Sequence, residues 1–158
     1  IGTYAGDDGT RLFSNLDVRS TGLNGGDDPH GTIEFEFTSG GKTYRLESDD
    51  IASLRVALDE SSDRVCRGPR PNQAPANWCT GTADIQATAT LFDNSKQPQV
   101  AVLEGLRLEV SITDRRTPGG VDTIAITAWE GNKQVFSSSW SGFAAVEQAL
   151  ASGTTRVQ

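Results

Sequence analysis

The chain has 158 residues, of which 35% are hydrophobic and 17 are glycine, and its formal net charge is −7. This length suits a single domain, residues 1–158, and the negative charge opposes binding to nucleic acid and to anionic membranes, both of which depend on clustered Lys and Arg. No apolar run approaches the roughly 18 residues that a membrane-spanning helix needs.

The first expected strands come before residue 50. Residues 12–19 form one strand, and the clearest hairpin joins segments 32–38 and 43–47 through a Ser-Gly-Gly-Lys turn. In segment 32–38 apolar residues alternate with acidic ones, which is typical of a strand with one face on a core. The inward residues are Ile33, Phe35 and Phe37, and the outward ones are Glu34 and Glu36.

Residues 51–58 can be interpreted in two ways. Leu54, Val56 and Leu58 share one face of a strand, whereas Ile51, Leu54 and Leu58 also fit the 3.6-residue period of a helix. Because Val56 interrupts the helical face, we predict a strand.

The second half of the chain contains further alternating segments, 82–91, 106–112, 122–129 and 133–140. Residues 143–150 are rich in Ala, Glu and Gln and predict a short helix, and residues 154–157 predict a last strand. About nine or ten strands with no linker between them predict an all-β domain. We expect a single antiparallel two-sheet sandwich of the jelly-roll or Ig-like type.

Two cysteines, Cys66 and Cys79, enclose a proline-containing segment and predict a disulfide-clamped loop. Such a bridge stabilises a fold by about 3 kcal/mol and needs an oxidising compartment. The chain contains no Met, which predicts an amino end processed by removal of a secretory signal. We therefore expect a secreted protein, in the extracellular medium or on the cell surface, and the lack of N-glycosylation sequons favours a bacterial source.

Catalytic residues are scarce. The one histidine, His30, lies beside a turn, and a Ser-His-Asp triad would have to use it; an exposed turn residue is the simpler interpretation. Bridged cysteines leave no thiol nucleophile. Glu34, Glu36 and Glu109 alternate outward on strands, which is typical of a solvated face rather than of paired glycosidase acids. The sequence predicts a protein that is not an enzyme.

Acidic turns are the one candidate for a bound cofactor. Ca²⁺ takes oxygen ligands from loops, and the residues that could supply them are Asp7, Asp8, Asp27 and Asp28. None of these turns has the spacing of an EF-hand, and Asp is common in turns because it bonds its own backbone. Structural calcium is the only cofactor candidate.

The loop between the cysteines gathers Arg67, Arg70 and Trp78 on an otherwise acidic chain. Arg and Trp are favoured at interface hot spots, so this loop is a candidate for binding or assembly. The alternative is a long connection with Trp78 packed onto the domain. Trp129 and Trp140 flank a tight turn, and alternation places Trp129 on the face opposite Ile126 and Ala128. That face is either in contact with solvent or covered by a second layer, and core packing is the favoured interpretation for at least one of the two tryptophans.

The carboxyl-terminal quarter resembles a diffuse group of secreted bacterial β-sandwich domains of unknown function. The resemblance lies mainly in residues 119–158: a Gly119-Gly120-Val121-Asp122 loop, an alternating strand that ends in Trp129, a returning strand to Trp140, and a final segment around Gly153. It implies a fold and secretion, and no catalytic residues.

These observations favour a non-catalytic structural or adhesion protein. A specific form is a subunit of a filament or surface layer in which a terminal strand adds to a neighbour's sheet. The strand-exchange residues would be Thr3, Tyr4, Ala5, Arg156 and Val157. The expected partners are further copies of the chain, an extracellular or cell-surface protein, or a glycan. The alternatives are a carbohydrate-binding module and a protease inhibitor that presents residues 66–79.

Overall fold

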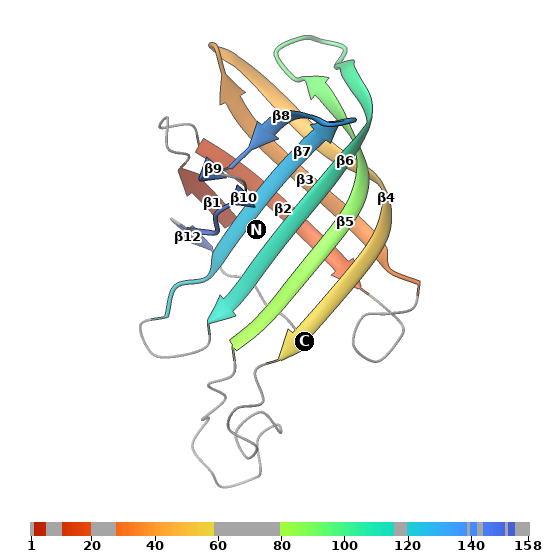
Figure 1. Cartoon of the computed structure of the whole chain (residues 1–158). Helices are drawn as coiled ribbons and strands as arrows, with labels where there is room; N and C mark the ends of the chain where they lie inside the picture. Colours follow the sequence, from red (N-terminus) through yellow and green to blue (C-terminus); the bar gives the residue numbers. More distant parts are fainter. Residues whose placement is uncertain are drawn as a thin grey trace, which may run out of the picture.

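The computed structural model is all-β (Figure 1). It describes residues 2–5, 11–19, 28–58, 80–115, 120–138, 140–141, 144–150 and 152–153. None of these residues lies in a helix, so this part of the chain has no helix that could cross a membrane. The predicted strand class is confirmed.

Six long strands follow one another around the sheet. They are β2 (Arg11–Arg19), β3 (His30–Ser39), β4 (Lys42–Leu58), β5 (Thr80–Asp93), β6 (Val100–Arg115) and β7 (Thr123–Glu130). Each pairs antiparallel with the next strand in the chain. The short strand β8 (Lys133–Ser137) then pairs with β7 through the tight turn at Gly131.

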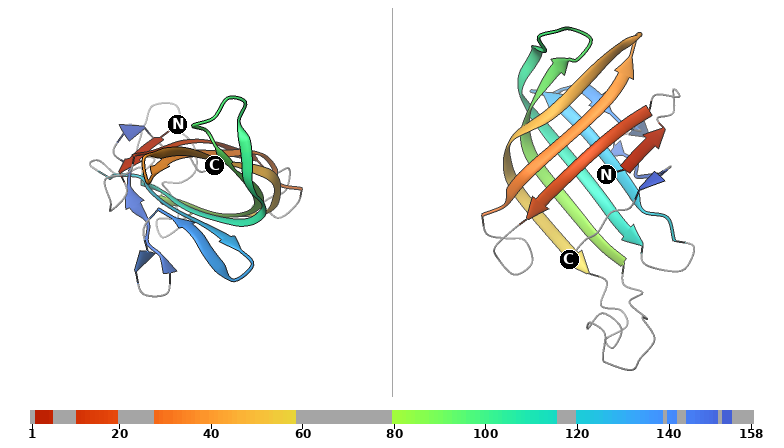
Figure 2. Two further views of the ribbon diagram at one scale, coloured as in Figure 1. Left: turned by 90° about the horizontal axis from the view of Figure 1, so that it is seen from above. Right: turned by 180° about the vertical axis from the view of Figure 1, so that it is seen from behind.

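The sheet curls until its two ends meet (Figure 2). At one end β1 (Gly2–Ala5) pairs with β2, and at the other end β11 (Gln148–Ala149) pairs with β7. β12 (Ser152–Gly153) pairs with β1, so the chain that passes from β11 to β12 links β7 to β1. The result is a flattened cylinder of strands.

The long strands therefore lie in one continuous sheet of ten strands, not in the two packed sheets that we expected. The other sheet contains just β9 (Trp140–Ser141) and β10 (Ala144–Ala145). A sandwich and a curled sheet place the same alternate residues inward, so the alternation could not distinguish them. Strand order decides, and here every long strand neighbours the next.

The short helix predicted for residues 143–150 is wrong. This segment contains β10 and β11, and β11 pairs with the first residues of β7. Local preference for helix is weak, and the unpaired edge of a strand offers backbone hydrogen bonds that override it.

β4 confirms the strand interpretation of residues 51–58 and explains the helical look of the pattern. Ile51 pairs with Ala87 and Ser53 pairs with Gln86, so Ala52 is an extra residue in a β-bulge. The bulge lets Ile51 and Leu54, three positions apart, both point inward, where they are 6% and 8% exposed.

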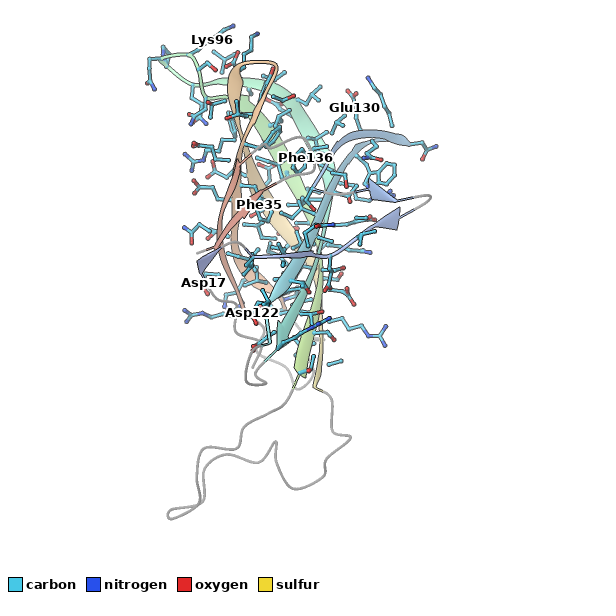
Figure 3. The ribbon with its side chains drawn as sticks, turned by 90° about the vertical axis from the view of Figure 1, so that its left-hand side faces the viewer. Asp17, Phe35, Lys96, Asp122, Glu130 and Phe136 are labelled. Carbon is cyan, nitrogen blue, oxygen red and sulfur yellow. The ribbon has the colours of Figure 1, made fainter. Side chains whose placement is uncertain are left out.

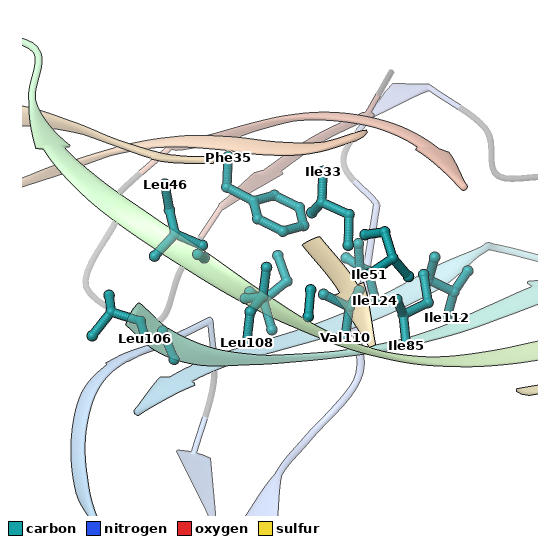
Figure 4. Packing of buried hydrophobic residues seen from close by; sticks show 14 of the residues in the cluster. Ile33, Phe35, Leu46, Ile51, Ile85, Leu106, Leu108, Val110, Ile112 and Ile124 are labelled. Atoms are coloured by element: carbon teal, nitrogen blue, oxygen red, sulfur yellow. The ribbon is translucent and has the colours of Figure 1, made fainter. Parts of the chain in front are cut away.

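The interior of the cylinder is filled with apolar side chains (Figure 4). Phe35 and Ile33 point from one wall toward Leu108 and Val110 on the opposite wall, and all four are at most 2% exposed. Burying each such side chain stabilises the fold by about 1.5–3 kcal/mol. The core is therefore shared by strands from both walls of the cylinder.

Aromatic rings continue this core toward β8. The ring of Phe136 stacks on Phe37 at a centroid distance of 4.2 Å, and Phe37 stacks on Tyr44 at 5.6 Å. In the side view Phe136 lies in the upper half of the molecule, as does Glu130 at the end of β7 (Figure 3). The contact joins β8 to β3, which is not its neighbour in the sheet.

Ser138 lets the chain leave the sheet without leaving the edge of β7 unpaired. Its backbone N–H donates to the carbonyl of Ile126 at 2.9 Å, and its Oγ accepts the N–H of Ile126 at 3.0 Å. One residue thus satisfies both backbone groups of Ile126 after β8 has ended. Lower on the same edge, Leu150 N–H donates to the carbonyl of Asp122 at 2.9 Å.

Replacement of Ser138 by alanine should lower the free energy of unfolding by about 1–3 kcal/mol, because the buried N–H of Ile126 loses its acceptor. Urea denaturation followed by circular dichroism measures the change. The matched control is Ser39→Ala, an exposed residue beside the β3–β4 turn, which should change stability by less than about 0.5 kcal/mol. Equal effects for the two variants would contradict this role of Ser138.

Gly31 is required for the pairing of β2 with β3. Its φ is 141°, and a Cβ there would lie 2.0 Å from the carbonyl oxygen of Asp17 and 2.8 Å from Cα of Val18. Backbone cannot move aside as a flexible side chain can, so alanine would have to separate the two strands at this point.

Gly31→Ala should therefore destabilise the protein by about 2 kcal/mol or more in thermal or chemical denaturation. Gly40→Ala is the control, since Gly40 also has positive φ, +58°, but has open space around its Cβ position. We expect a cost of about 1 kcal/mol there, from backbone strain alone. If Gly31→Ala lowers stability no more than Gly40→Ala does, the close approach of Gly31 to the backbone of β2 is not needed for the fold.

Candidate functional site

The outer face of the sheet carries a row of polar residues across β4–β7. Trp129 pairs with Arg107, Arg107 with Thr88, and Thr88 with Asp50, so the four residues stand side by side on four neighbouring strands. Their inward neighbours, such as Leu108 and Ala128, are fully buried. We call this the upper row.

A second row lies next to it, one step further along each strand. It contains Thr127, Glu109, Gln86 and Ser53, which are again cross-strand partners. Gln86 and Ser53 are exposed, Glu109 is half-buried and Thr127 is 2% exposed. We refer to the two rows together as the outer platform.

Glu109 organises the centre of the outer platform. Its Oε2 accepts the indole N–H of Trp129 at 3.2 Å, and its Oε1 lies 3.3 Å from Nε of Arg107. The guanidinium of Arg107 lies 5.5 Å from the centroid of the Trp129 ring, a cation–π distance. Both oxygens of Glu109 are thus engaged, so this carboxylate orients its neighbours and is a poor candidate for proton transfer.

The exposed part of the outer platform offers hydrogen-bonding groups to solvent. The side chains of Thr88 and Gln86 are exposed, and no hydrogen bond joins either of them to another described residue. Arg107 has a side chain that is 55% exposed, and Nε is the nitrogen that meets Glu109. The chemistry available here is that of a binding surface for a polar, hydroxyl-rich molecule.

Among the described residues no three His, Cys, Asp or Glu side chains converge as a metal site would require. Of the four aspartates considered for calcium, Asp28 is exposed with φ of 48°, whereas Asp7, Asp8 and Asp27 lie outside the described residues. The structure therefore leaves the calcium candidate as a prediction.

His30 is exposed at the start of β3, and its Nδ1 lies 3.1 Å from the backbone carbonyl oxygen of Asp28. No serine hydroxyl contacts it in the part of the chain that the structure describes. On the paired strand β2, Arg19 donates to both carboxylate oxygens of Asp17, at 3.0 and 3.1 Å. These hydrogen bonds and the positive charge of Arg19 lower the pKa of Asp17, and the same hydrogen bonds and the negative charge of Asp17 raise the pKa of Arg19.

The acidic side chains that we expected on a solvated face form ion pairs or hydrogen bonds with neighbouring side chains. Glu34 and Glu47 lie 3.1 and 3.3 Å from Nη2 of Arg45, and Glu36 accepts the side-chain amide of Asn94 at 3.0 Å. Glu109 is the one that reaches a tryptophan. This arrangement agrees with the outward orientation that the alternation predicted.

The residues proposed for assembly are placed in part. Thr3, Tyr4 and Ala5 lie in β1, inside the chain's own sheet, whereas Arg156 and Val157 lie outside the described residues. The two cysteines and the loop between them also lie outside the described residues, including Cys66, Cys79, Arg67, Arg70 and Trp78. The strands that flank this loop are held together, because Leu58 pairs with Gly81.

Alternation correctly predicted that Trp129 lies on the face opposite Ile126 and Ala128, but sequence reasoning missed its partners. Arg107 and Glu109 alternate outward in the sequence as many charged residues do. Only the register between β6 and β7 shows that they adjoin the tryptophan. Trp140, the second tryptophan near this turn, lies in β9 and its side chain is not described.

Comparisons with protein-family models, with curated proteins and with solved structures find no match to this chain.

Thr127 provides a test of how the outer platform is packed. Its buried Oγ1 has no hydrogen-bond partner among the described residues, and an unsatisfied buried hydroxyl costs stability. Thr127→Val should raise the free energy of unfolding by about 1 kcal/mol. Thr113→Val, at a half-exposed position on β6, is the matched control and should have a smaller effect in the same urea titration. A destabilised Thr127 variant would mean that the hydroxyl has a bonding role.

Proposed function

We propose that the chain is a non-catalytic secreted structural or adhesion protein that works through its outer surface. The observation that carries the proposal is the filled interior: Phe35, Leu46, Leu106 and Leu108 are fully buried, and most polar side chains of the described residues lie on the outside. The charged residues found there are mostly held in ion pairs or hydrogen bonds. The resemblance of residues 119–158 to secreted bacterial β domains supports the same proposal.

A filament or surface layer is the specific form that we favour. β1 is four residues long and pairs with β2 on one side and with β12 on the other. If β1 or β12 left its own sheet, the same pairing could form with a neighbouring copy, and the cylinder of each subunit would be closed by its neighbour's strand. Head-to-tail exchange of this kind builds open fibres.

Carbohydrate binding is the alternative function, favoured by the outer platform with Trp129 at its edge. A protease inhibitor that uses the loop of Cys66 and Cys79 is a weaker proposal. It is supported by the pairing of Leu58 with Gly81, which holds the ends of β4 and β5 together on either side of this loop. We also propose that Cys66 and Cys79 form a disulfide and that the protein is extracellular.

Light scattering and electron microscopy over a range of concentrations test the assembly. We expect polymers in concentrated preparations of the native chain. A particle that stays monomeric throughout would overturn the filament form.

A staple across β1 and β12 tests the exchange of strands. Thr3 and Ser152 are direct partners, so the double variant Thr3→Cys with Ser152→Cys should lock β1 in its own sheet under oxidising conditions. We expect the stapled protein to fold and to remain monomeric. The control staple joins Asn15→Cys to Glu34→Cys, partners on β2 and β3, and should leave polymerisation unchanged. Polymers that form equally well with the first staple would contradict terminal-strand exchange.

A further inference from the structure

We infer that the outer platform binds an uncharged oligosaccharide, laid across β4–β7 along the upper row from Trp129 to Asp50. This inference rests on the carbohydrate-binding alternative above and specifies its ligand and its site.

The upper row has the dimensions of a short linear ligand. Trp129, Arg107, Thr88 and Asp50 stand on four consecutive strands of one sheet. Neighbouring strands lie about 4.8 Å apart, so three such spacings make the row roughly 14 Å long. A row of this length matches an extended chain of a few sugar rings better than a single small molecule.

The side chains in this row supply the contacts that sugars use. A sugar ring has an apolar face, which packs on an aromatic ring, and a rim of hydroxyls, which both donate and accept hydrogen bonds. Trp129 provides the aromatic surface and is half-buried. Arg107 can donate, Asp50 can accept, and Thr88 can do both.

Gln86, in the second row, adds an amide next to Thr88. Because neither side chain bonds to another described residue, a ligand hydroxyl that reaches them does not have to break an internal hydrogen bond. Both are exposed, so they are reachable from solvent.

The central part of the site is held in place before any ligand arrives. Glu109 accepts from Trp129 and pairs with Arg107, while Arg107 lies against the Trp129 ring. These three mutual contacts limit the rotamers of the tryptophan and of the arginine. Less conformational entropy is then lost on binding, which favours affinity for a weakly binding ligand class such as sugars.

Charge selects an uncharged ligand. The positive charge of Arg107 is matched by the negative charge of Glu109, and Asp50 leaves the site with a net charge of about −1. The whole chain has a net charge of −7. Uronic acid and sulfated polysaccharides would therefore be repelled, whereas sugars with hydroxyls alone would not.

The test is calorimetric titration of the full chain with neutral hexose and pentose oligosaccharides of four to six rings, and with oligouronates of the same length. We expect at least one neutral oligosaccharide to bind and the oligouronates to bind at least about tenfold more weakly. Trp129→Phe, Arg107→Ala and Asp50→Ala should each weaken that binding about tenfold. Thr38→Ala, an exposed outward residue on β3, should not change it.

Thermal denaturation of each variant shows whether its fold is intact. Asp50 and Thr88 are exposed, so Asp50→Ala and Thr88→Ala test the site even if Trp129→Phe is destabilised. Neutral binding that none of the variants weakens would overturn the site. Equal or tighter binding of oligouronates would overturn the uncharged ligand and leave carbohydrate binding standing. If no sugar binds, the inference and the carbohydrate alternative both fall, and the assembly proposal is unaffected.

Discussion

The closure of the sheet depends on one requirement, that the second edge of β7 finds partners for its backbone. β8 pairs with its upper part, Ser138 satisfies both backbone groups of Ile126, and β11 pairs with its lower part. Since a buried unpaired N–H or C=O costs free energy, each of these contacts is needed. Only because the chain returns to this edge can it continue to β12 and meet β1, so the enclosed core depends on the same edge.

This construction separates the inside of the cylinder from the outside. Most inward positions are occupied by apolar side chains from both walls, rings such as Phe136 extend the packing, and Asp93 and Asp114 are buried near the ends of β5 and β6. Outward positions carry paired charges and hydroxyl or amide groups. A surface contact at the outer platform therefore leaves the core undisturbed, and rigid strands hold its side chains more firmly than a loop would. Adhesion and sugar binding are both compatible with such a scaffold.

The strands were predictable because a buried face leaves a period of two in the sequence, as in β3, where Ile33, Phe35 and Phe37 are all buried. The position of Trp129 on the face opposite Ile126 and Ala128 followed from the same rule. Two features could not be predicted. A single curled sheet has the same alternation as a sandwich, and β11 forms from helix-favouring residues because β7 needs a partner. The outer platform was also hidden, since its members come from four strands and register alone brings Arg107 to Trp129.

The pairing of β1 with β12 also bears on the order of folding. β2 to β7 can form one hairpin after another through short-range contacts, whereas the partners Gly2 and Gly153 are 151 residues apart, the difference between their numbers. Loop-closure entropy disfavours such a distant contact until the rest of the sheet has brought the two ends together. We therefore expect this seam to close last, to exchange its amide hydrogens first, and to open while the rest of the sheet stays intact.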